Sequence, residues 1–159
     1  MSVTGERACG KSNNDVTQFT SNVAFNHFPR SLKNFFPNLR FLFINKSNIT
    51  TLSKNDFCFG SKLDHILFES TNLEVLEADL FDNLPQLVYL VLRAKQLKHV
   101  SQGALSKLQK LEIFQFDGSP CKTGVFSNER SVVINLVASI ESQCNDVQAL
   151  ERHRRLIAT

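Results

Sequence analysis

An apolar pattern restarts four times along this chain at a constant step. Leu39, Leu63, Leu87 and Leu111 are each 24 residues apart, and each opens a run L-x-x-[LIF]-x-[ILF]. In these runs, apolar residues at the fourth and sixth positions alternate with their neighbours, as in a short strand with one buried face. Because self-similarity at a fixed period is the signature of stacked structural units, the sequence predicts a solenoid.

The second half of each unit keeps the same phase. Asn48-Ile49, Asn72-Leu73 and Gln96-Leu97 occupy equivalent positions. Further in-phase apolar residues follow, namely Leu52, Leu76, Val100, Phe57, Phe81 and Leu105. From residue 39 to about residue 120 the chain resembles the leucine-rich repeat family, pattern LxxLxLxxNxLxxLxxxxFxxLxx, in the 24-residue type common in extracellular proteins. The resemblance implies an α/β fold, a right-handed leucine-rich repeat solenoid in a short horseshoe, with a parallel β-sheet on the concave face and a helical C-terminal cap.

Neighbouring units must stack, because one unit has too few apolar residues to bury itself. In the family, amide side chains form an asparagine ladder where the chain leaves each strand. The resemblance therefore implies that Asn48 and Asn72 are buried, while Gln96 departs from the ladder.

The chain divides into a repeat region at 39–116 and two ends that must cap it. Residues 1–38 form an N-terminal cap with one degenerate repeat, whose apolar rhythm is Val16, Phe19, Phe25, Phe28, Leu32 and Phe36. Residues 117–159 form a C-terminal cap and a helical, partly exposed tail. The pattern predicts a helix starting near Ser127, with Glu129 in its first turn. Its apolar stripe over the last repeat is Val133, Val137 and Ile140, with Ile134 beside them.

Composition narrows the classes of function. The chain has 159 residues, 42% of them hydrophobic, which suffices for the core of one domain. Its 14 Phe residues are natural core fillers. A net charge of +3, with the tail arginines at a solvated helix end, does not indicate nucleic-acid binding. No apolar run reaches about 18 residues, so no membrane span is expected, and no leader is expected either.

The four cysteines favour an oxidising compartment. The resemblance implies that Cys121 and Cys144 form the disulfide of the C-terminal cap. For Cys9 and Cys58, a bridge between the N-terminal cap and the first repeat competes with a free, buried Cys58. Of the two glycosylation sequons, Asn45-Lys-Ser and Asn48-Ile-Thr, only Asn45 is predicted to carry a glycan, because Asn48 belongs to the expected ladder.

Nothing in the sequence supports an enzyme. Residues 5–12, GERACGKS, match the phosphate-binding P-loop pattern, with Lys11 and Ser12 as nominal contacts. A P-loop needs a strand before it and a helix after it, and neither is predicted, so the match is interpreted as chance. The four histidines, His27, His65, His99 and His153, are scattered, and no metal or catalytic motif appears. No cofactor or metal is predicted.

The candidate binding site comes from the repeat registry. In such solenoids positions 3, 5 and 7 of each unit face the concave side, which gives three columns. The columns are Phe41, His65, Tyr89, Ile113; Phe43, Leu67, Val91, Gln115; and Asn45, Glu69, Arg93, Asp117. The first two columns are apolar for residues that should meet water, which is typical of a binding patch, and His65 would add pH sensitivity. The charges of the third column either pair across adjacent strands or select the charges of a partner.

Three explanations of the apolar columns stay open: a protein partner, self-association into a homodimer, or a chain end folded over the face. The first hypothesis is a secreted protein-binding module, similar to small insect extracellular repeat proteins and distantly to Toll-like receptor ectodomains. An innate immune or host-interaction role is implied only by that resemblance. The alternative is an intracellular adaptor, such as a ubiquitin-ligase substrate receptor or a delivered effector, with reduced thiols.

Overall fold

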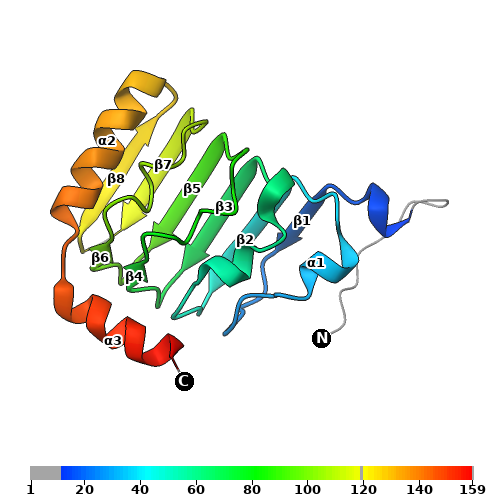
Figure 1. Cartoon of the computed structure of the whole chain (residues 1–159), viewed down its shortest axis with the longest axis horizontal. Coiled ribbons are helices and arrows are strands. Elements are labelled where there is room, and N and C mark those ends of the chain that lie inside the picture. The colour runs from blue at the N-terminus through cyan, green and yellow to red at the C-terminus, as the bar shows by residue number, and fades with distance from the viewer. Residues whose placement is uncertain (1–11, 119, 159) are drawn as a thin grey trace.

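The computed structural model describes residues 12–118 and 120–158. Six strands form one sheet in the order β1-β2-β3-β5-β7-β8, and two short strands form a second sheet, β4-β6 (Figure 1). The strands are β1 (Gln18–Ser21), β2 (Phe41–Ser47), β3 (His65–Ser70), β4 (Val75–Leu76), β5 (Tyr89–Ala94), β6 (His99–Val100), β7 (Ile113–Gly118) and β8 (Lys122–Ser127). Each pair is parallel except β7 and β8, which are antiparallel. The predicted solenoid with a parallel sheet is confirmed.

The 24-residue step sets the register of the large sheet. Phe41, His65, Tyr89 and Ile113 are lateral neighbours on consecutive strands. Side chains at positions 4 and 6 of each unit point inward and are buried, namely Leu42, Ile44, Ile66, Phe68, Leu90, Leu92, Phe114 and Phe116. Since side chains alternate along a strand, positions 3, 5 and 7 face outward on every strand. We call this side of the sheet the outer face.

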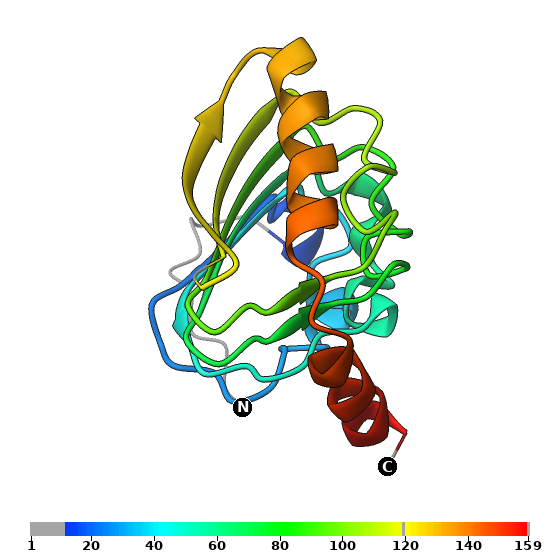
Figure 2. The ribbon, with the colours of Figure 1, turned by 90° about the vertical axis from the view of Figure 1, so that its left-hand side faces the viewer.

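Short helical turns and loops close the other side of the solenoid (Figure 2). They comprise η1 (Asn13–Asp15), α1 (Leu32–Phe35), η2 (Lys54–Phe57) and η3 (Gly60–Lys62). The apolar rhythm of the degenerate repeat is confirmed as core, because Phe28, Leu32 and Phe36 are buried and the other three pack against the core. The nominal P-loop lies outside the described residues except for Ser12, whose side chain caps η1 by accepting a hydrogen bond from the Asn14 amide.

Two serines, and not the predicted asparagines, fill the interior positions where the chain leaves strands β2 and β3. Ser47 and Ser70 are fully buried, and their hydroxyls donate to the Glu69 and Ile49 carbonyls at 2.8 and 2.7 Å. Asn48, Asn72 and Gln96 are exposed, so the prediction of a buried asparagine ladder is wrong. In the first repeat, the register shifts between Ile44 and Ser47, and Lys46 adopts a φ of 59°. This irregularity pairs Ser47 with Ser70 and turns it inward, whereas the three amide positions are exposed with or without a shift.

Helix α2 (Arg130–Gln143) closes the C-terminal end, and its buried residues are the predicted Val133, Val137 and Ile140. The helix begins three residues later than predicted, because residues 122–127 form β8 and Ser127 exchanges hydrogen bonds with Glu129 instead of capping. The predicted Cys121–Cys144 disulfide is present and ties the turn before β8 to the end of α2.

Helix α3 (Val147–Ile157) packs against β4 and β6, and each side of this packing carries one buried histidine. His99 on β6 is 5% exposed and His153 on α3 is 3% exposed. His99 Nδ1 and His153 Nε2 are buried and accept or donate no hydrogen bond within the described part of the chain. Burial lowers the pKa of both side chains, although Glu77 opposes the shift. Arg154 lowers both pKa values further, so each ring is held neutral.

We therefore expect the protein to lose stability in mild acid. A histidine whose pKa is lower in the folded than in the unfolded state stabilises the fold above its unfolded pKa of about 6.5 and ceases to do so as the pH falls. The thermal midpoint should drop between pH 7 and pH 5, and a His99→Gln, His153→Gln variant should drop less. His27→Gln, at an exposed position, is the control. Equal pH slopes in all three proteins would contradict this assignment.

Candidate binding surface on the outer face of the sheet

The outer face carries the three predicted columns, and the strand register aligns them. Eleven of the twelve residues are half-buried: Phe41, Phe43, Asn45, His65, Leu67, Glu69, Tyr89, Arg93, Ile113, Gln115 and Asp117. The twelfth, Val91, is 2% exposed. The expectation that Val91 meets water is therefore wrong. Val91 lies on β5, between Leu67 on β3 and Gln115 on β7.

Aromatic rings form a row across three strands of this face. The centroid of Phe41 lies 4.7 Å from that of His65, and His65 stacks on Tyr89 at 5.3 Å. Phe43 lies 6.5 Å from Phe41 along β2. The rings border a hollow of about 390 Å³, lined by Gln18, Thr20, Phe41, Phe43, Asn45, His65, Leu67 and Tyr89. Rigid aromatic walls with amide and hydroxyl groups at the border are the composition of an interface core.

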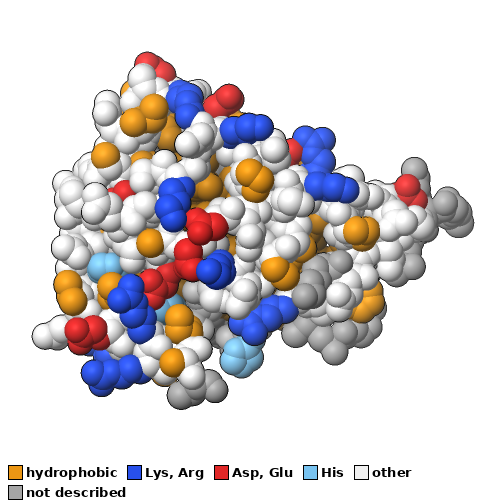
Figure 3. All heavy atoms as spheres, viewed as in Figure 1, with side chains coloured by type: hydrophobic (Ala, Val, Ile, Leu, Met, Phe, Trp, Pro, Cys, Tyr) orange, Lys and Arg blue, Asp and Glu red, His pale blue; other side chains and the backbone are white. Residues whose placement is uncertain are grey.

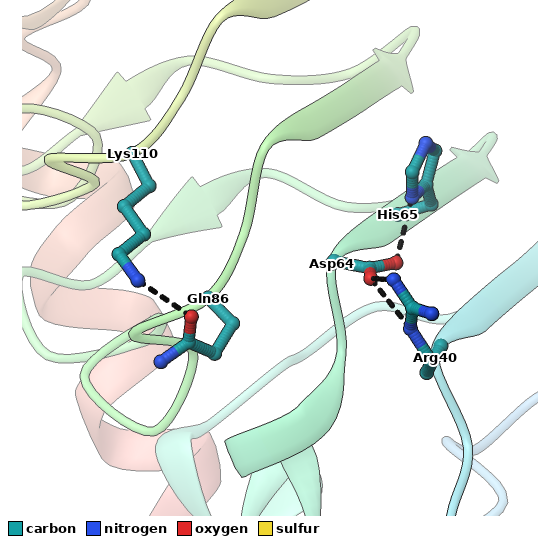
Figure 4. A network of polar contacts seen from close by, with 5 residues as sticks. All are labelled: Arg40, Asp64, His65, Gln86 and Lys110. Atoms are coloured by element: carbon teal, nitrogen blue, oxygen red, sulfur yellow. Dashed lines mark hydrogen bonds and ion pairs between the residues drawn. The ribbon is translucent and has the colours of Figure 1, made fainter.

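A charged network fixes the ring in the middle of the row. Asp64 Oδ1 lies 2.7 Å from His65 Nδ1, and Arg40 Nε donates to Asp64 Oδ2 at 2.7 Å (Figure 4). Partial burial opposes ionisation of Asp64, but the hydrogen bonds from His65 and Arg40 outweigh it and lower its pKa. Asp64 therefore holds Nδ1 as the donor and orients the ring between Phe41 and Tyr89.

Side chains at equivalent positions of neighbouring repeats also contact each other. Lys110 Nζ donates a hydrogen bond to Oε1 of Gln86, which lies one repeat earlier, at 2.6 Å (Figure 4). In the charged column, Arg93 Nη1 lies 3.9 Å from Glu69 Oε2, so these two charges face each other across adjacent strands. The pairing alternative fits Glu69 and Arg93, whereas Asp117 Oδ1 is buried without a partner among the described residues.

Sequence reasoning missed three residues of this face. Gln18 and Thr20 on β1 pair in register with Phe41 and Phe43 and line the hollow. Phe126 on β8 lies beside Gln115 and is 62% exposed. Gln18 and Thr20 were missed because the degenerate repeat does not keep the 24-residue register. Phe126 was missed because it lies after a hairpin that is not part of any repeat.

The opposite side of the molecule is unlike this face. Lysines and arginines there alternate with acidic side chains instead of forming an area of one sign (Figure 3). A larger hollow of about 900 Å³ lies between residues 51–56 and the end of α3. Its charged walls are already paired, as Lys54–Asp79 at 3.0 Å and Arg154–Glu77 at 3.2 Å show. We place the candidate site on the outer face, because half-buried aromatic rings gather there beside a hollow that no Lys, Arg, Asp or Glu lines.

Three further predictions concern cysteines, metals and membranes. Cys58 is a free thiol, as one of its two alternatives had it, but it is exposed and not buried, and Cys9 lies outside the described residues. Within 12–118 and 120–158, no cluster of three side chains suits a metal ion. In the same residues, no helix has the length and apolar character needed to cross a bilayer.

Comparison with protein-family models, curated proteins and solved structures finds no match to this chain.

Proposed function

We propose that this protein is a secreted, non-enzymatic binding module of the right-handed leucine-rich repeat type, which holds a protein partner on the outer face of its sheet. The observation that carries the proposal is the aromatic row Phe41–His65–Tyr89 beside an apolar hollow. The repeat assignment is supported by one strand of the sheet in each 24-residue unit. The Cys121–Cys144 disulfide supports an oxidising compartment, as in secreted proteins.

The geometry favours an uncharged, apolar segment of the partner. No Lys, Arg, Asp or Glu lines the hollow, and Nδ1 of His65 is engaged by Asp64. Two pairs of charges on neighbouring repeats, Arg40 with Asp64 and Arg93 with Glu69, are paired with each other. A charged side chain placed in this hollow would lose water without gaining an opposite charge. An aromatic or aliphatic side chain would gain contact area on several rings.

The test is a Phe43→Asp, Tyr89→Asp variant of the whole chain. Immobilised protein is exposed to extracellular fluid from its natural source, and retained proteins are identified by mass spectrometry. We expect the variant to lose the retained partner while its thermal midpoint stays within a few degrees, because both side chains are only half-buried.

The control is a Val132→Asp, Ile134→Asp variant, which adds the same charges on the exposed side of α2. It should retain the partner as the unchanged protein does. Full capture by the Phe43, Tyr89 variant would contradict the outer face as the site. A partner retained only from cytosolic lysate would favour the intracellular adaptor instead, and a second copy of this chain as the retained protein would favour a homodimer.

A further inference from the structure

We propose that Asn48, and not Asn45, is the acceptor of an N-linked oligosaccharide. The inference rests on the proposed secretory route but not on the proposed partner site. Two sequons follow each other in the chain, Asn45-Lys46-Ser47 and Asn48-Ile49-Thr50. The sequence alone favours Asn45, since the asparagine of the second sequon was expected to be buried. The structure instead favours Asn48 over Asn45.

Asn48 lies just beyond the end of β2, and its side chain is exposed. Thr50 is exposed as well, while Ile49 between them is fully buried in the core. The burial of Ile49 fixes the local backbone, and the Asn48 amide donates to the Phe25 carbonyl at 2.8 Å. The side chains of Asn48 and Thr50, the two that define the sequon, are therefore exposed to solvent on a segment whose backbone is fixed.

The nitrogen of Asn48 that would carry the sugar, Nδ2, makes no hydrogen bond with the described residues. Its Oδ1 accepts a hydrogen bond from Thr71 Oγ1 at 3.0 Å. Its Nδ2 donates to no group within the described residues, so a sugar on that nitrogen displaces no hydrogen bond seen there. The contact with Thr71 uses only the oxygen, and it would survive the modification.

Asn45 is in the opposite situation. Its Nδ2 donates to Asn22 Oδ1 at 2.8 Å, and its side chain is half-buried at the border of the apolar hollow. The hydroxyl of its sequon, that of Ser47, is fully buried and donates to the Glu69 carbonyl. A glycan on Asn45 would lie over the hollow, whereas a glycan on Asn48 leaves the end of the strand and keeps the outer face open.

The chemistry needs only the donor that the secretory route supplies, a lipid-pyrophosphate-linked oligosaccharide. The Asn48 carboxamide nitrogen forms a bond to C1 of the first sugar and loses one proton. The bond from C1 to the pyrophosphate oxygen breaks, and the lipid pyrophosphate leaves with that electron pair. No group is oxidised or reduced.

Trypsin offers a direct test, because Lys46 separates the two sequons. Cleavage after Arg40, Lys46 and Lys54 places Asn45 on peptide 41–46 and Asn48 on peptide 47–54. The full chain is secreted from insect cells and treated with peptide N-glycosidase in heavy-oxygen water. The enzyme converts a glycan-bearing asparagine to a heavy-labelled aspartate. We expect the label on peptide 47–54 in most molecules.

Two variants sharpen the result. Asn48→Gln should lose the glycan mass completely, and Asn45→Gln should keep it. Label on peptide 41–46, or secreted protein with the Cys121–Cys144 bridge and no label on either peptide, would overturn the proposal. Partner capture is measured separately on enzymatically deglycosylated protein, so the loss of the partner site and the loss of the glycan site are told apart.

Discussion

Replacing Phe57 by Ala is expected to lower the free energy of unfolding by about 3–5 kcal/mol. Phe57 is 1% exposed, and its ring centroid lies 5.0 Å from that of Phe28 and 5.8 Å from that of Phe81. The ring thus joins the N-terminal segment to two consecutive repeats. Its removal leaves a cavity that three separate units would have to close together, so little relaxation is expected. Urea unfolding followed by far-UV circular dichroism measures the loss.

Phe126→Ala is the matched control for this prediction. The same side chain is removed, but Phe126 is 62% exposed. The free energy of unfolding should change by no more than about 0.5 kcal/mol. Equal losses from both variants would show that the buried ring contacts of Phe57 with Phe28 and Phe81 are not what holds the first repeats together.

Replacing both Cys121 and Cys144 by Ala should cost about 3.5 kcal/mol of stability. The two residues are separated by 23 positions, and a bridge that closes a loop of this length removes conformational entropy from the unfolded chain and so raises its free energy by roughly that amount. The bridge also fastens the end of α2, which covers the last repeat. The measurement is the denaturant midpoint of the variant against the unchanged protein under non-reducing conditions.

Cys58→Ala is the control for the disulfide, because Cys58 is exposed and free. It should leave the midpoint within experimental error. A double Cys121, Cys144 variant as stable as the Cys58 variant would contradict a stabilising role for the bridge. A reducing agent should destabilise the unchanged protein and the Cys58 variant to the same extent.

The repeat period predicted the solenoid, the lateral alignment of strands and most of the core. This succeeded because stacking forces every unit to bury the same positions, as the aligned Phe41, His65, Tyr89 and Ile113 show. The cap helix was predicted for a related reason. Val133, Val137 and Ile140 recur at helical spacing, and only a helix puts them on one side.

The failures have separate causes. The register shift near Lys46 puts Ser47 in the interior, because a slip of one residue exchanges the two faces of a strand. Asn48, Asn72 and Gln96 are exposed in all three units, so their exposure does not depend on this shift. Strand β8 runs antiparallel and follows no repeat, so neither it nor Phe126 carried a periodic signal. The burial of Val91 depends on the size of the side chains around it, which alternation does not encode.

Helix α3 changes how the stack should respond to force and to heat. In a simple stack each unit touches only the next one, so single units can open independently. Here the helix returns beside β4 and β6 (Figure 1). Arg154 on this helix donates a hydrogen bond to Glu77, 77 positions earlier in the sequence. The helix thus works as a brace between the capped end and the middle of the stack. Opening a middle unit must detach the brace as well, which makes unfolding more cooperative than the repeat architecture alone would dictate.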